Sequence, residues 1–129
     1  MFDTGELRSL VADLGKIPAA TFPAVEKVVD EHGEKLRERW ASNASATAGD
    51  HGKHYPRSIT AQIKPGLGTI GVEVGPESGK PQGGMGKGFE YGSRNQPPHM
   101  DGNRAADALE PEFAAALPKL LSDLLGKAL

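Results

Sequence analysis

The sequence contains no cysteine and few aromatic residues. Without cysteine, disulfide bonds, thiolate metal sites and cysteine nucleophiles are all excluded. Aromatic residues make up 5% and hydrophobic residues 37% of the 129 positions, which is a modest share for a globular domain. Residues 1–129 are therefore expected to form one domain with a thin core and much loop.

The sequence also lacks a dominant charge and a long apolar run. Fifteen basic and seventeen acidic residues give a net charge of −2, so no overall positive field favours nucleic-acid binding. Asp3 and Glu6 fall where an export signal needs a basic start and an apolar run. No stretch approaches the roughly 20 apolar residues of a membrane span. We therefore expect a soluble chain that is made in a cytoplasm and has no membrane partner.

Two helices are predicted in the first third of the chain. A short amphipathic helix is indicated because apolar residues recur at helical spacing, at Leu7, Leu10, Val11 and Leu14. A longer helix is predicted over residues 21–44, since its apolar positions from Val25 to Trp40 share one face. Trp40 ends that stripe and is expected to pack in the core. The small, polar segment 42–53 that follows is expected to be a mobile loop.

An antiparallel hairpin is predicted in the middle of the chain. Residues 57–64 and 69–74 each alternate apolar with polar or small side chains, as half-buried strands do. The segment 65–68, Pro-Gly-Leu-Gly, supplies the residue types of a tight turn between them. Pairing across so short a connection makes the two strands antiparallel.

A long loop rich in glycine and proline, residues 75–88, follows the hairpin. Phe89, Glu90 and Tyr91 then predict a brief third strand that ends at Gly92. In a strand, Phe89 and Tyr91 would point the same way, toward the helices, and Glu90 would face away from the core.

The last segment, residues 103–129, predicts helix with one apolar face that includes Phe113. Proline in a helix interior costs roughly 3 kcal/mol. We therefore expect a short helix that ends near Leu109, a longer one that starts near Glu110, and a kink or break near Leu117.

The predicted fold class is α+β. A small antiparallel sheet, made of the hairpin and a short third strand, is flanked by N-terminal and C-terminal helices and carries a long glycine-rich loop.

No motif for catalysis, cofactor binding or metal binding stands out. Pro81 stands where a phosphate-binding loop needs its first glycine, and Gly88 stands where that loop needs Ser or Thr. The four histidines do not share the spacing of metal ligands on one helix face. Glu90, between two aromatic residues, could serve acid–base chemistry, but we favour a structural role or a salt bridge to a neighbouring subunit. We assign no catalytic, cofactor-binding or metal-binding residue.

A loose series of basic residues lies on the hairpin and its loops, with few acids among them: Arg57, Lys64, Lys80, Lys87 and Arg94. Such a series could meet an acidic partner surface or passing DNA, although scattered surface lysines usually do neither. It is not concentrated enough to predict a nucleic-acid-binding face.

The run from Gly88 to Leu109, GFEYGSRNQPPHMDGNRAADAL, resembles the head–tail joining family, the small neck or tail-completion proteins of long-tailed bacteriophages. The family pattern is a strand ending in Glu-Phe/Tyr-Gly-Ser/Thr, then a proline-containing turn, then a C-terminal helix. Its residues in this chain are Glu90, Tyr91, Gly92, Ser93, Pro97 and Pro98. The upstream order of helix, polar loop, Arg-Ser-Ile strand and hairpin also agrees, so the resemblance covers most of the chain. Many relatives continue with Phe-Leu and Pro-Ala, where this chain has His-Met and Asp-Gly-Asn.

The resemblance implies a virion structural protein without catalytic residues or cofactor, which forms a ring, commonly sixfold, at the head–tail junction. It is assembled in the host bacterial cytoplasm. The implied partners are other copies of the chain, the head-completion or connector protein, and the tail-terminator or tail-tube protein, with DNA passing transiently through the ring. The six motif residues are expected to make assembly contacts, and Trp40, Phe89 and Phe113 to pack. Two alternatives stay open: a tail-terminator protein that caps the tail tube, and a stand-alone binding module.

Overall fold

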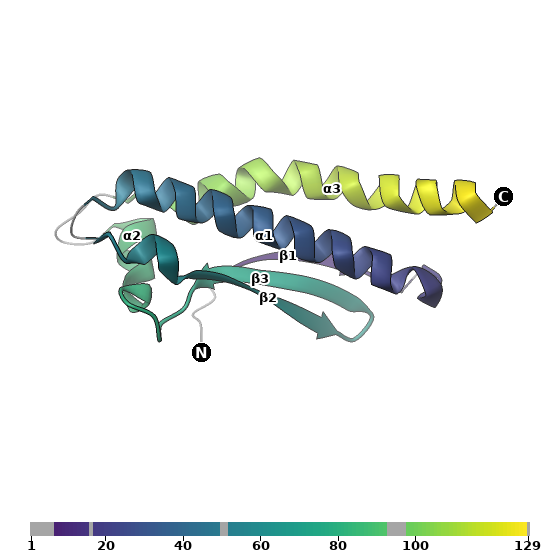
Figure 1. Cartoon of the computed structure of the whole chain (residues 1–129), viewed down its shortest axis with the longest axis horizontal. Helices are drawn as coiled ribbons and strands as arrows, with labels where there is room; N and C mark the ends of the chain where they lie inside the picture. Colours follow the sequence, from purple (N-terminus) through teal and green to yellow (C-terminus); the bar gives the residue numbers. More distant parts are fainter. Residues whose placement is uncertain (1–6, 16, 50–51, 93–97, 129) are drawn as a thin grey trace.

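The computed structural model describes residues 7–15, 17–49, 52–92 and 98–128, with side chains described as far as residue 124. The fold is α+β, as predicted: a three-stranded antiparallel sheet carries two long helices (Figure 1). The strands are β1 (Arg8–Asp13), β2 (Ile59–Gly66) and β3 (Thr69–Pro76). The helices are α1 (Phe22–Thr47), α2 (Gly86–Tyr91) and α3 (Asp101–Ala128). Short 3-10 helices lie between them: η1 (Ala19–Thr21), η3 (Tyr55–Ser58) and η4 (Gly83–Met85).

The predicted hairpin is confirmed. β2 and β3 pair antiparallel along their whole length, around a turn at Leu67 and Gly68. Gly68 has a φ of +71°, in the left-handed region that glycine adopts without strain. Pro65 was predicted to lie in the turn but extends β2 instead. A proline is tolerated there because β2 is an edge strand of the sheet.

The third strand of the sheet is β1, so the prediction of a helix at residues 7–14 is wrong. β1 pairs antiparallel with β3, which makes β3 the central strand. Leu10 and Ala12 are buried beneath the helices, whereas Val11 between them is 55% exposed. Leu7, Leu10, Val11 and Leu14 have the spacing of a helix, whereas Leu10, Ala12 and Leu14 have the spacing of a strand. The free edge of β3 decides between them, because it supplies backbone hydrogen bonds to a segment too short to be stable as a lone helix.

The prediction of a strand at Phe89–Tyr91 is also wrong, because these residues lie in α2. Residues two apart in a helix point to different sides, so Phe89 is buried while Tyr91 is 46% exposed. The Phe89 ring stacks on Tyr55, with the ring centroids 4.2 Å apart. The glycine-rich loop is consequently shorter than predicted, spanning only residues 77–82 between β3 and η4.

Helix α1 is confirmed and runs further than predicted, to Thr47. Residues 42–47, which were expected to belong to a mobile loop, are therefore helical. Ala44 is fully buried there, and alanine has the highest intrinsic helix propensity of any residue. Asp50 and His51, from the same predicted loop, lie outside the described residues.

Helix α3 continues through Pro111 and Pro118, so the predicted breaks are wrong. Both prolines lie on its exposed side, where water can solvate the carbonyl groups that lose their helical partner. Leu109, Phe113 and Leu117 pack against the core on the opposite side and hold the two halves of the helix in line.

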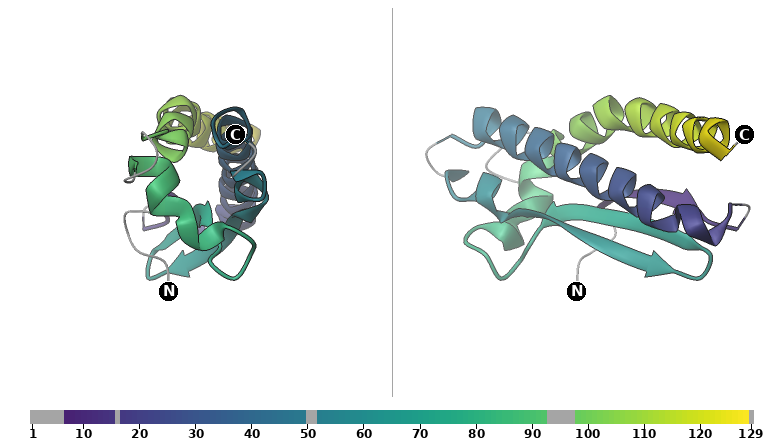
Figure 2. Two further views of the ribbon diagram at one scale, coloured as in Figure 1. Left: turned by 90° about the vertical axis from the view of Figure 1, so that its left-hand side faces the viewer. Right: turned by 45° about the vertical axis from the view of Figure 1, so that its right-hand side comes forward.

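The elements form two layers, with the helices on one face of the sheet (Figure 2). Helix α1 packs against all three strands, and α3 packs against β1. The layers meet closely at Gly33, where a Cβ atom would stand 2.7 Å from Val72 Cγ1. No described element covers the other face of the sheet, on which Val11, Gln62 and Lys64 are exposed.

We predict that Gly33→Ala destabilises the protein although alanine favours helix. The gain in helix propensity is about 1 kcal/mol, but the added methyl group would overlap the stiff, β-branched Val72 side chain. Overpacking of this kind costs about 1–3 kcal/mol, and a Cβ this close to Val72 places the cost in the upper part of that range. After the gain in helix propensity is subtracted, the free energy of unfolding should fall by up to about 2 kcal/mol in urea denaturation.

Gly79→Ala is the matched control, because nothing lies within 4 Å of a Cβ at that exposed glycine. It should unfold at the urea concentration of the wild type or slightly above. In the double variant Gly33→Ala/Val72→Ala, the decrease in the free energy of unfolding should be smaller than the sum of the decreases in the two single variants. Additive losses would show that the two positions do not collide.

Candidate functional site

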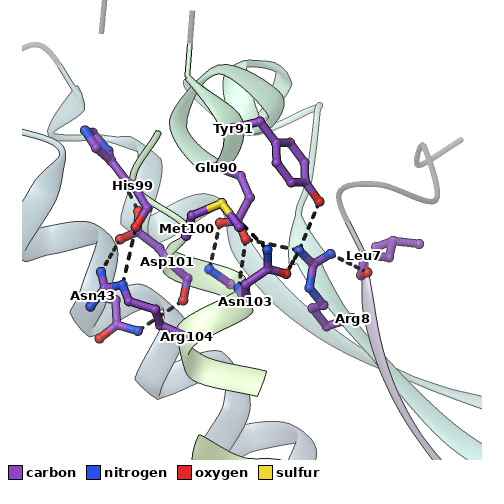
Figure 3. A network of polar contacts seen from close by, with 11 residues as sticks. Leu7, Arg8, Asn43, Glu90, Tyr91, His99, Met100, Asp101, Asn103 and Arg104 are labelled. Carbon is purple, nitrogen blue, oxygen red and sulfur yellow. Dashed lines mark hydrogen bonds and ion pairs between the residues drawn. The ribbon is translucent and has the colours of Figure 1, made fainter. Parts of the chain in front are cut away.

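Glu90 and Tyr91 meet the first turn of α3 in a buried polar network (Figure 3). Glu90, on α2, is only 2% exposed and lies at its centre. Its Oε1 accepts a hydrogen bond from the Gly102 N–H at 2.7 Å, and its Oε2 accepts one from the Asn103 N–H at 2.8 Å. The first N–H groups of a helix have no partner within the helix, and the helix dipole makes this end positive. The Glu90 carboxylate therefore caps α3 from a different helix.

Arg8 joins the N-terminal strand to this cap. Its guanidinium donates to Glu90 Oε2 at 3.1 Å and to the Tyr91 hydroxyl at 3.1 Å, and it also donates to the Asn103 side-chain oxygen. The same guanidinium lies 5.9 Å from the centre of the Trp40 ring, a cation–π contact. One arginine thus connects β1, α2, α3 and α1.

A second carboxylate, Asp101, ties the start of α3 to the end of α1. It is 1% exposed, and its two oxygens accept from the Thr47 hydroxyl at 2.9 and 3.0 Å. Arg104 donates to the same carboxylate at 2.9 Å, and the Asn43 side chain donates to the Asp101 carbonyl at 3.1 Å. His99 Nδ1 stands 4.0 Å from its carboxylate. Both buried acids at this junction are therefore held by several donors.

Two residues just before α3, His99 and Met100, are bonded to the backbone of α2. The His99 N–H donates to the Phe89 carbonyl, and the Met100 N–H donates to the Glu90 carbonyl, each at 2.9 Å. The next residue but one, Gly102, lies flat against Trp40, because a Cβ there would stand 2.6 Å from the indole ring. Side-chain and backbone bonds of Glu90 therefore act together to fix where α3 begins.

These contacts suit a structural joint better than a reacting group. Both oxygens of Glu90 are occupied by donors, and the carboxylate is closed off from solvent. The expectation that Glu90 faces away from the core is wrong, because it was derived from a predicted strand, and the segment is in fact a helix.

Among residues 7–15, 17–49, 52–92 and 98–128, no group of three His, Cys, Asp or Glu side chains could hold a metal ion. None of the helices in these ranges is both long and apolar enough to cross a membrane.

The structure brings together only part of the predicted motif. Glu90 and Tyr91 belong to the network, Gly92 follows them with a φ of +88°, and Pro98 is exposed. Ser93 and Pro97 lie outside the described residues. The residues expected to pack, Trp40, Phe89 and Phe113, are all buried.

The sequence patterns did not indicate that Arg8, Asp101 and Asn103 belong to this network. An aspartate just before an apolar periodic segment is a helix-start signal and could have pointed to Asp101. No local signal marks Arg8, which is 82 residues from its partner Glu90.

No family model, curated protein or solved structure matches this chain. The resemblance to the head–tail joining family therefore stays a prediction that rests on the residues themselves.

We predict that Glu90→Gln lowers the free energy of unfolding by about 2–4 kcal/mol, because it leaves Arg8 without its counter-charge and turns an N–H donor toward the helix N–H groups. Urea denaturation followed by circular dichroism measures this loss. Glu110→Gln, at an exposed position on α3, is the control and should change stability by less than about 0.5 kcal/mol. Equal unfolding midpoints for the two variants would contradict the capping role.

Proposed function

We propose that this chain is a non-enzymatic structural subunit of the neck of a long-tailed bacteriophage, a head–tail joining protein. In this role it forms a ring, together with other copies of itself, between the head connector and the tail. The ring would contact the connector protein on one side and the tail-terminator or tail-tube protein on the other, and DNA would pass through it.

The observation that carries the proposal is the use made of Glu90. In the sequence pattern of the resemblance, this acid is the first residue of the motif and lies at the end of a strand, whereas in this fold it lies on α2. In the fold the Glu90 carboxylate accepts two hydrogen bonds from backbone N–H groups of α3 and one from the Arg8 guanidinium. These bonds fix the position of α2 relative to α3. A motif whose acid holds two helices in register fits a protein that is selected for shape and rigidity, as an assembly subunit is.

The open face of the sheet supports the same proposal. Within the described residues, the outer strands β1 and β2 each pair on one edge only, and no described element covers the face that carries Val11 and Lys64. Uncovered edges and faces are where subunits join, and contacts between different surfaces of identical subunits close into rings. A single layer of helices on a three-stranded sheet leaves such surfaces available.

We expect inactivation of the gene in its phage to yield DNA-filled heads and finished tails that do not join, visible by electron microscopy. Supplying the wild-type chain should restore joined particles. Tails of abnormal length would instead identify a tail terminator, because a cap sets where the tube stops growing. Normal virions without the chain would contradict both roles and favour a stand-alone binding module.

The purified chain should be a monomer, or associate only weakly, at micromolar concentration. The exposed side chains on the open sheet face are mostly polar, so the face offers little apolar surface to drive self-association without partner proteins. Sedimentation velocity measures the oligomeric state. A stable closed ring of the isolated chain would show that other proteins are not needed to assemble it.

A further inference from the structure

Two members of the basic series, Arg57 and Lys80, line one hollow at the end of the molecule where η3 meets the loop after β3. The hollow has a volume of about 260 Å³, and its walls are His54, Arg57, Lys80 and Pro81. Arg57 comes from η3, and Lys80 and Pro81 come from the loop of residues 77–82. The fold therefore brings together basic residues that are far apart in the sequence.

Hydrogen bonds fix both walls of the hollow. The His54 N–H donates to the Gln82 side-chain oxygen at 2.8 Å, and the Glu77 N–H donates to the Ser58 carbonyl at 2.8 Å. Within the loop, the Lys80 N–H donates to the Glu77 carbonyl at 3.0 Å. The two segments are thus held against each other, and the hollow is a built feature of the fold.

Positive charge dominates around the hollow. Segments 52–58 and 77–82 carry Lys53, Arg57 and Lys80, against the single acid Glu77. Lys80 Nζ lies 4.0 Å from the Glu77 carboxylate, and both side chains are about half exposed, so that ion pair is weak. The Arg57 side chain is exposed and has no hydrogen bond or ion pair with any other residue in the described part of the chain. Two cations therefore face the hollow with little to neutralise them.

The geometry points to a binding site for a phosphate group in this hollow, with Arg57 and Lys80 as its charged contacts and the His54 ring beside them. A guanidinium offers two parallel N–H donors that match phosphate oxygens, and an ammonium adds a compact charge. A phosphate group has oxygens enough for both cations at once, whereas a single carboxylate, with two oxygens and one charge, would be shared between them. The volume also suits a phosphate group with several water molecules, each of which takes about 30 Å³.

The phosphate group could belong to a nucleic-acid backbone or be free inorganic phosphate, and the contacts are the same in both cases. The site does not rest on the proposed function, since it follows from the hollow and its charges alone. The net charge of −2 leaves the rest of the chain without a general attraction for nucleic acid, so the hollow is where binding should concentrate.

The first experiment follows nitrogen–proton spectra of the wild-type chain during titration with sodium phosphate, against sodium chloride at matched ionic strength. Phosphate should shift the Arg57 side-chain signal and the backbone signals of His54 and Lys80, with saturation. Arg57→Gln and Lys80→Gln should each weaken binding severalfold. Lys119→Gln, an exposed lysine on α3, is the charge-matched control and should bind as the wild type does.

The second experiment measures binding of a short labelled DNA duplex by fluorescence anisotropy at several salt concentrations. The two charged contacts, Arg57 and Lys80, predict a roughly 12-fold loss of affinity between about 50 and 200 mM salt, and Arg57→Gln should reduce the salt dependence by about one contact. Thermal melting of each variant should match the wild type, since Arg57 and Lys80 are exposed.

Binding of duplex that depends on Arg57 assigns the phosphate to nucleic acid, and binding of inorganic phosphate alone assigns it to a small anion. The inference is overturned if neither probe binds, or if binding is the same in Arg57→Gln and Lys119→Gln. Preference for an acidic peptide over both phosphate probes would also overturn it.

Discussion

The fold depends on one buried carboxylate, that of Glu90, and on the three donors that surround it. Burying an isolated charge costs several kcal/mol, and only well-placed hydrogen bonds and an opposite charge offset that cost. The donors come from the first turn of α3 and from Arg8 on β1. The strand, α2 and α3 therefore stabilise one another, because removing any one of them leaves a charge or a helix end unsatisfied in the interior.

This joint explains how a chain with a thin core can hold two long helices on a three-stranded sheet. Asp101 repeats the arrangement on the other side of the α3 N-terminus, where Thr47 and Arg104 satisfy it. At Gly33 and Gly102 the helix backbone packs directly against the side chains of Val72 and Trp40, because glycine has no Cβ that would keep them apart. The polar corner is thus tightly bonded, whereas no described element covers the opposite face of the sheet, and the proposed assembly role would use that face.

The errors in predicting the fold share one physical origin, since each concerns a segment whose conformation is chosen by distant contacts. In residues 7–14 one set of apolar residues fits a helix and an overlapping set fits a strand, and pairing with the edge of β3 makes the segment a strand. Phe89 and Tyr91 alternate as in a strand, but stacking of Phe89 on Tyr55 and the bonds of Glu90 favour a helical turn. In α3, packing of Phe113 outweighs the cost of Pro111, a balance that propensity alone does not include.

The sequence by itself determined the α+β class, helix α1, the β2–β3 hairpin and the apolar face of the C-terminal segment, because local periodicity and turn chemistry decide these over a few residues. The tertiary structure alone decided that Glu90 caps α3, that Arg8 pairs with it from 82 residues away, and that Arg57 and Lys80 share a hollow. Such contacts depend on how separate elements dock. Docking is set by the packing of the whole chain, which no local pattern of residues records.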